Sequence, residues 1–130
     1  MPPRFDLLGL VVADMARSLS FYRLVGLDIP KEADTEGHVE IRLARGLRLA
    51  FDTVEVVHSF DAEWSAPSGG SRVALAFLCD NPEEVDGLFR QLTDAGHRGH
   101  HEPWDAFWGQ RYATVLDPDG NAVDLFAPLP

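Results

Sequence analysis

One sequence unit occurs twice in this 130-residue chain, and the duplication restricts the possible folds more than any other pattern. In "LLGLVVADMARSLSFYRLVGL" and in "VALAFLCDNPEEVDGLFRQLTDAG", an apolar strand ends near an acidic residue, and a following amphipathic helix closes at glycine. Each half of the chain reads as β-α-β-β-β. A half of this kind cannot bury a sheet face alone, so two halves are expected to pack together.

The first half begins with an apolar strand at about Phe5–Val12. Asp14 stands where a helix N-cap belongs, and Gly26 supplies the helix end. Two further strands are predicted at about Val39–Leu43 and Leu47–Phe51, on either side of a short Arg-Gly turn.

The second half repeats this order with a strand at Val73–Leu78. Asn81 is the predicted N-cap of a helix that opens with Pro and two Glu and ends at Gly96. A hairpin is predicted from Tyr112–Leu116 and Ala122–Phe126, because "DPDGN" between them contains typical turn formers.

These elements predict one α+β domain over residues 1–130. Its half-modules cover about 1–58 and 71–130, and a linker that contains "SAPSGG" covers about 59–70. Paired βαβββ modules with curved sheets form a cup-shaped cavity, the kind of concave place where small molecules bind.

Charge narrows the range of partners. The chain has 21 acidic residues against 11 Lys and Arg, and the formal net charge of -10 repels nucleic acid and anionic lipid while it attracts cations. We find no apolar run of about 20 residues and no secretory leader pattern, so we expect a cytoplasmic protein with neither nucleic-acid nor membrane partners. The single cysteine, Cys79, excludes an internal disulfide and is expected to be a buried, inert thiol.

The segment "EPWDAFWGQRYATVLDPDGNAVDLF" places three large aromatic side chains in a predicted connector. Trp108 is expected to face a ligand, and Gly109 lets the backbone turn sharply after it. For Trp104 and Phe107, capping of the core or a dimer contact is as consistent with the sequence as ligand contact.

Polar residues close to this segment are further candidates. Arg111 is either a hydrogen-bond donor in the cavity or, as surface arginines usually are, the partner of a carboxylate. The ring of Tyr112 is expected to pack while its hydroxyl meets water or ligand, and Asp124 either recognises a ligand or accepts structural hydrogen bonds.

Candidates also come from the first half and the linker. Alternation along the strand directs Asp52 toward the cavity, where an acid favours a cationic or hydrogen-bond-donating ligand. The residues that are candidates to complete the pocket are His38, Glu40, Phe51, Asp52, Phe60 and Trp64. The histidines of "HRGHH" after Gly96 are expected to be solvated or partly packed and not metal ligands.

The opening "VVADMARSLSFY", the repeated unit and the ending "LDPDGNAVDLF" resemble the vicinal oxygen chelate superfamily over the whole chain. That superfamily includes glyoxalase I, ring-cleaving dioxygenases and bleomycin resistance proteins. "WGQRYATVLDPDGN" is similar to the Trp-Gly-x-x-aromatic-Ala-x-x-Asp-Pro-x-Gly-Asn pattern of its antibiotic-sequestering branch, and "EPWDAFWGQRYA" and "VDLFAPLP" look closest to mitomycin resistance proteins. The resemblance implies a homodimer of the domain-swapped type, in which two chains jointly wall two cavities.

Enzymes of this superfamily use four metal ligands, His, Glu or Gln, from the first and last strands of each half. At the corresponding positions this chain has Leu7, Val73, an apolar residue within 49–51, and Asp124. One carboxylate does not hold a catalytic divalent ion, which needs about three protein ligands. We therefore expect neither a metal nor another cofactor.

The sequence thus predicts an antibiotic-binding protein that confers resistance by sequestering an aromatic drug of the mitomycin or bleomycin type. It shows no Ser-His-Asp or Cys-His arrangement and no Gly-rich phosphate loop. The alternative is a metal-dependent or metal-free enzyme of the same superfamily, lyase-like or dioxygenase-like, that acts through Asp52, Asp124 or a histidine. A third interpretation is an interaction module whose aromatic segment serves only a dimer interface.

Overall fold

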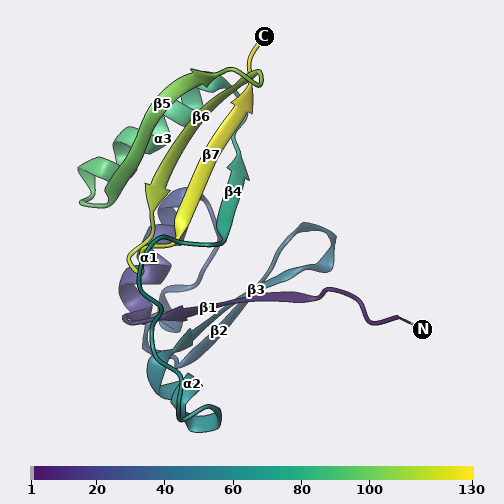
Figure 1. The fold of residues 1–130 in the computed structure, drawn as a ribbon, viewed down its shortest axis with the longest axis vertical. Coiled ribbons are helices and arrows are strands. Elements are labelled where there is room, and N and C mark those ends of the chain that lie inside the picture. The colour runs from purple at the N-terminus through teal and green to yellow at the C-terminus, as the bar shows by residue number, and fades with distance from the viewer. Residues whose placement is uncertain (1) are drawn as a thin grey trace. The chain divides into compact units, whose positions relative to one another are not determined.

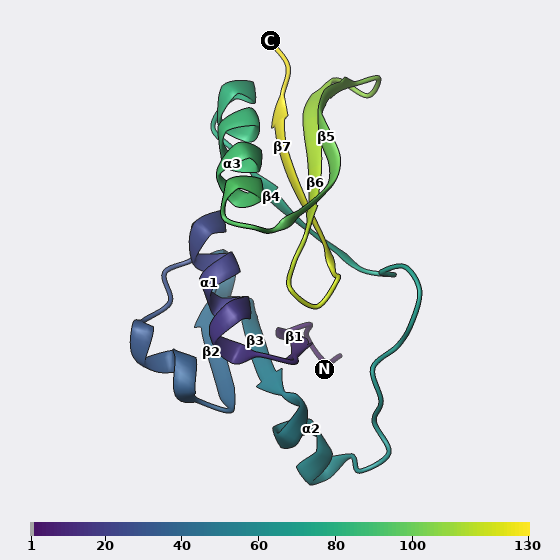
Figure 2. The same cartoon turned by 90° about the vertical axis from the view of Figure 1, so that its left-hand side faces the viewer.

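A computed structural model describes residues 2–130 as two compact units, each with its own β-sheet (Figures 1 and 2). Unit 1 comprises Met1–Leu19 and Asp28–Pro67, and unit 2 comprises Ser20–Leu27 and Ser68–Pro130. The mixed α+β composition, with two sheets and three α-helices, confirms the predicted fold class. None of the helices in residues 2–130 has the length and apolar character needed to cross a bilayer.

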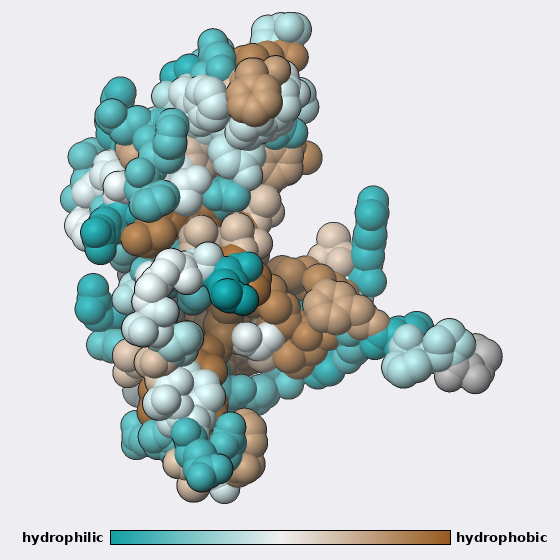
Figure 3. All heavy atoms as spheres, viewed as in Figure 1, coloured by the Kyte–Doolittle hydropathy of each residue, from teal (hydrophilic) through white to brown (hydrophobic). Residues whose placement is uncertain are grey.

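The sheet of unit 1 has the strand order β1-β3-β2, with β1 at Leu7–Val12, β2 at His38–Arg42 and β3 at Arg48–Thr53. β1 runs parallel to β3, and β2 is antiparallel to it. β1 is therefore an edge strand, and Figure 3 shows apolar side chains gathered over β1 and β3.

Helix α1, Met15–Val25, begins and ends where the sequence predicts. The Asp14 carboxylate accepts a hydrogen bond from the backbone N–H of Arg17 at 3.2 Å, as an N-cap side chain does. Gly26 follows the helix with φ 120°, a conformation that residues with a Cβ rarely adopt.

The first half departs from the predicted β-α-β-β-β order, because unit 1 contains three strands. A 3₁₀ helix at Lys31–Thr35 lies between α1 and β2. It is held by a local backbone hydrogen bond, which the Ala33 N–H donates to the Pro30 carbonyl. An additional helix, α2 at Val54–Phe60, precedes the linker. The β-branched residues in "TVEVVHSF" obscure this helix in the sequence, but the Thr53 hydroxyl caps it by accepting from Val56 N.

Unit 2 contains the complete β-α-β-β-β order in a sheet arranged β4-β7-β6-β5. Its elements are β4 (Ala74–Leu78), α3 (Pro82–Asp94), β5 (Arg98–Ala106), β6 (Gln110–Leu116) and β7 (Ala122–Pro128). β4 is parallel to β7, and the other neighbouring pairs are antiparallel.

Helix α3 covers one face of this sheet, as Figures 1 and 2 show. The Asn81 side chain caps it by accepting from Glu84 N at 2.8 Å, as predicted. The side chains that fill the space between helix and sheet are fully buried and small or branched: Val85, Leu92, Ala113, Val115, Val123, Leu125 and Ala127. The opposite sheet face carries the candidates Trp104, Tyr112 and Asp124.

Candidate functional site

The aromatic segment of unit 2 is a strand followed by a tight turn. β5 extends to Ala106, so Trp104 lies within a nine-residue strand, and the expectation that it belongs to a connector is wrong. Phe107, Trp108 and Gly109 form the turn to β6. Gly109 has φ 94°, and its N–H donates to the Ala106 carbonyl at 3.0 Å, which closes a three-residue hairpin loop.

An irregularity in β5 brings two of its side chains onto the same sheet face. His101 pairs with Thr114, and Trp104 pairs with Tyr112, so three residue steps on β5 match two on β6. An extra residue of this kind re-aims the side chains that follow it. As a result the rings of His101 and Trp104 are neighbours, with centroids 5.3 Å apart.

Five aromatic side chains form what we call the aromatic face of unit 2: Trp104, Phe107, Trp108, Tyr112 and Phe126. Cross-strand register places Trp104, Tyr112 and Phe126 side by side on β5, β6 and β7. The Trp108 ring stands edge-on to Tyr112 with centroids 5.2 Å apart. Phe107 is 90% exposed and Trp108 is 48% exposed, so both present ring surface to solvent.

A polar row lies next to these rings on the same face. Thr114 on β6 pairs with Asp124 on β7, and this pair lies next to the Tyr112–Phe126 pair on the same face. The Tyr112 hydroxyl donates to Asp124 Oδ2 and the Thr114 hydroxyl donates to Asp124 Oδ1, both at 2.7 Å. Burial and the bond to Asp124 raise the pKa of Tyr112 to about 12, so its hydroxyl keeps its proton.

Arg111 does not share this face, because consecutive strand residues point to opposite sides of a sheet. Its guanidinium holds both oxygens of Asp86 on α3 at 2.9 and 3.2 Å, and it donates to Asp105 at 3.0 Å. These carboxylates raise the pKa of Arg111. An open groove of about 660 Å³ lies beside this ion-paired arginine at the start of α3, away from the aromatic face. Of the two roles considered for Arg111, the structure therefore supports the carboxylate partner.

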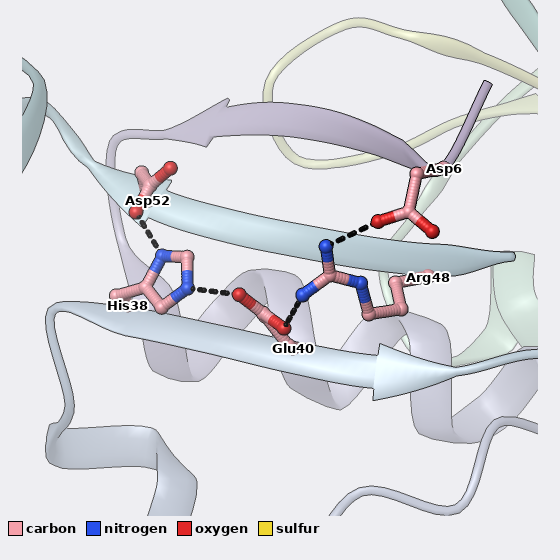
Figure 4. A network of polar contacts seen from close by, with 5 residues as sticks. All are labelled: Asp6, His38, Glu40, Arg48 and Asp52. Atoms are coloured by element: carbon pink, nitrogen blue, oxygen red, sulfur yellow. Dashed lines mark hydrogen bonds and ion pairs between the residues drawn. The ribbon is translucent and has the colours of Figure 1, made fainter. Parts of the chain in front are cut away.

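Three candidates of unit 1, His38, Glu40 and Asp52, come together in a chain of polar contacts (Figure 4). His38 donates from Nδ1 to Asp52 at 2.5 Å and from Nε2 to Glu40 at 2.8 Å. Arg48 donates to the other oxygen of Glu40 at 2.6 Å and to Asp6 at 2.5 Å. The network arises because His38 faces Asp52 across the β2–β3 ladder, while Glu40 lies two residues further along β2 on the same face.

Both nitrogens of His38 point at acceptors, and this arrangement favours the imidazolium. Hydrogen bonds to Asp52, and then to Glu40, raise the pKa of His38. The bonds from His38 and Arg48 lower the pKa of Glu40. When His38 is protonated, both ring nitrogens are donors in this network and neither keeps a lone pair for a metal.

The remaining unit 1 candidates do not join this network. Phe51 is 0% exposed and belongs to the core, so the expectation that it lines a pocket is wrong. Phe60, 73% exposed, ends α2. Trp64 follows it, partly buried, and its carbonyl accepts from His58 Nε2 at 2.8 Å. The sequence candidates thus form two groups, one in each unit.

The residues present do not fit the divalent ion of the superfamily's enzymes. Asp124 pairs with Ala76 on β4 and with Thr114 on β6, so neither strand neighbour is a carboxylate or an imidazole. His97 stacks edge-on against Phe21, and His101 Nδ1 bonds to the Glu102 carbonyl. Within residues 2–130, no group of three or more His, Cys, Asp and Glu side chains has an arrangement suited to a metal.

Thr114 and Phe126 complete the site but were absent from the candidates chosen on sequence. Thr114 lies two residues from Tyr112, and Phe126 lies two residues from Asp124. Residues two apart in a strand lie on the same face. Once Tyr112 and Asp124 are assigned to the open face, strand alternation therefore assigns Thr114 and Phe126 to it as well.

The family model for the Glyoxalase/Bleomycin resistance protein/Dioxygenase superfamily matches residues 4–125. The chain belongs to this superfamily. The resemblance seen in the motifs is thus confirmed, as is the fold. No curated protein matches the chain.

Solved structures share the fold at low sequence identity. A glyoxalase/bleomycin resistance protein/dioxygenase family enzyme from Burkholderia phytofirmans PsJN is 19% identical, with a TM-score of 0.82 over 98% of this superfamily member and 100% of that chain. A glyoxalase-related enzyme from Fulvimarina pelagi is 21% identical, with a TM-score of 0.78 over 95% and 87% of the two chains. A protein of unknown function from Agrobacterium tumefaciens str. C58 is 27% identical, with a TM-score of 0.73 over 99% and 97%.

Proposed function

We propose that this superfamily member binds an aromatic antibiotic, of the mitomycin or bleomycin type, and confers resistance by sequestering it as a homodimer in the cytoplasm. The observation that carries the proposal is the aromatic face of unit 2, with Trp108 and Phe107 held in solvent contact by a three-residue turn. The closed loop restrains its backbone, and Trp108 contacts the rings of Phe107 and Tyr112, so less ordering entropy is lost when a flat ligand stacks there.

Stacking can supply a useful affinity. Each aromatic pair contributes about 0.5 to 1.5 kcal/mol beyond the burial of its area. Micromolar affinity corresponds to about 8 kcal/mol. Two or three ring contacts, the apolar area that they bury and a few polar contacts reach this range.

The chemistry of the face suits retention of a ligand better than its conversion. Tyr112, with a pKa of about 12, stays neutral near pH 7, and its proton is already shared with Asp124. Trp108 donates its indole N–H to Gln110 at 2.8 Å. The hydroxyls of Tyr112 and Thr114 both donate to Asp124, and a carboxylate is a weak base for activating a hydroxyl.

Titration with mitomycin C and with bleomycin, followed by tryptophan fluorescence, tests the proposal. We expect saturable quenching, release of unchanged drug on denaturation, and a loss of affinity of about tenfold or more in Trp108→Ala. Trp64→Ala is the matched control, because Trp64 belongs to unit 1 and contacts His58. Absence of binding by every member of a wider panel of aromatic antibiotics would contradict the proposal.

A metal-free enzyme is the second candidate, and the His38 network favours it. A histidine with a raised pKa between two carboxylates can donate a proton to a bound substrate as a general acid. This function predicts that a drug is chemically altered during incubation, and that His38→Gln abolishes the change while binding persists. Mass spectrometry of the recovered drug distinguishes the two candidates.

A further inference from the structure

We propose that Asp124 anchors the ligand and restricts it to planar aromatic compounds with a cationic or N–H-donating edge. The inference rests on the proposed function, since it concerns the ligand class of the same aromatic face. It also goes beyond stacking, because stacking alone tolerates rings of any charge.

The geometry places the carboxylate at the edge of a stacked ring. Asp124 and Phe126 lie two residues apart on β7, and their partners Thr114 and Tyr112 lie two apart on β6. Two strand residues span about 7 Å, roughly the width of an aromatic ring with its substituent. A flat ligand against Tyr112 and Phe126 therefore presents one edge to Asp124.

The polar groups beside that edge offer acceptors. The hydroxyl protons of Tyr112 and Thr114 are both directed to Asp124, which leaves their oxygens as acceptors toward a ligand. The ionised carboxylate accepts about four hydrogen bonds and receives two here, so lone pairs remain.

The flanking rings direct N–H groups away from that edge. His101, across the ladder from Thr114, directs Nδ1 to the Glu102 carbonyl at 2.8 Å. The indole N–H of Trp108 is engaged by Gln110. A ligand that itself brings acceptors or negative charge would leave these groups unpaired, which is the costly outcome. The formal net charge of -10 acts in the same direction.

Three tricyclic probes of similar size test this selectivity at near-neutral pH: proflavine as a cation, acridine as a neutral ring, and acridine-9-carboxylate as an anion. Tryptophan fluorescence titrations at low and moderate salt report binding. We expect proflavine to bind at least about tenfold more tightly than acridine, and the carboxylate to bind weakest. Asp124→Asn should remove most of the difference between proflavine and acridine while acridine affinity changes little.

Asp94→Asn is the matched control, because it removes one charge from an exposed position on α3. It should leave the proflavine preference intact at moderate salt. An equal loss in Asp94→Asn and Asp124→Asn would show that the overall field selects the ligand, and would overturn the anchor.

Thr114→Val keeps the inference falsifiable if Asp124→Asn does not fold. This variant retains the carboxylate, frees its Oδ1 and removes one neutral acceptor, so the preference for proflavine over acridine should persist. A selective loss of proflavine binding in Thr114→Val would contradict the anchor. Binding of all three probes without preference defeats this inference and leaves the proposed function standing, whereas binding of none defeats the proposed function.

Discussion

At the scale of single residues, Asp117 is a buried carboxylate of unit 2 that accepts four hydrogen bonds. Only 4% of it is exposed. It accepts from the backbone N–H groups of Asp119 and Asn121, from the Asn121 amide and from the Tyr22 hydroxyl, at 2.7 to 3.0 Å. The first residue of the "DPDGN" turn thus links the β6–β7 hairpin to the end of α1.

We expect Asp117→Ala to lower the free energy of unfolding by about 3 kcal/mol or more, because four donors lose a charged acceptor in a buried place. Urea unfolding followed by circular dichroism measures the change. Asp94→Ala, at an exposed position, should shift it by no more than about 0.5 kcal/mol. Similar shifts in the two variants would show that the turn does not depend on these bonds.

His38 makes stability depend on pH. Its folded-state pKa is raised above the ordinary 6.5 by Asp52 and Glu40. The stabilisation is therefore present in full below about pH 6.5 and is lost as pH rises through the folded-state value. Relative to His38→Gln, the advantage of the native protein should shrink as the pH rises above about 6.5.

An NMR titration of the His38 ring gives a direct check. Asp52→Asn removes the first cause of the shift, so the titration midpoint of His38 should fall toward its ordinary value. An unchanged His38 midpoint in Asp52→Asn would show that Asp52 does not raise the pKa of His38.

At the scale of elements, the β5–β6 hairpin depends on one glycine. Gly109 has φ 94°, where a Cβ is strained even though the surrounding space is open. We expect Gly109→Ala to cost about 1 to 2 kcal/mol of unfolding free energy and to weaken drug binding, because Trp108 precedes the strained position. Gly70→Ala, without a positive φ, should be neutral for both quantities. If drug affinity is unchanged in Gly109→Ala, the conformation of this turn does not contribute to drug binding.

Elements with complete local signals could be predicted from sequence. Helix α3 has an Asn cap, a first-turn Pro, acidic residues and a closing Gly, and its predicted start and end agree with the structure. α2 and the 3₁₀ helix at Lys31–Thr35 could not be predicted. α2 is short and rich in β-branched residues, and a single helical turn depends on local backbone bonds that leave no periodic pattern.

At the scale of the whole molecule, we expect a homodimer with twice the chain mass of 14.4 kDa. The edge strands β1 and β4 have one sheet neighbour each, and apolar side chains cover β1. An exposed apolar edge favours association with another chain. Sedimentation equilibrium measures the mass.

The same measurement on Trp108→Ala tests whether the aromatic face serves the interface. We expect this variant to remain dimeric while drug binding is lost. Dissociation into monomers, together with the absence of drug quenching in the native protein, would instead support an interaction module.

The sequence by itself determined the duplicated β-α unit, the superfamily motifs and the apolar residues at three of the four positions where the superfamily's enzymes have metal ligands. These features are local, because strand and helix periodicity, caps and turns are encoded within a few residues. Only the tertiary structure decided which side of a sheet each candidate occupies. A one-residue irregularity in β5 brings Trp104 onto the face of Tyr112, while alternation turns Arg111 to α3. Register and burial depend on partners distant in the chain. Candidates that are neighbours in the sequence, such as Arg111 and Tyr112, therefore lie on opposite faces of the sheet.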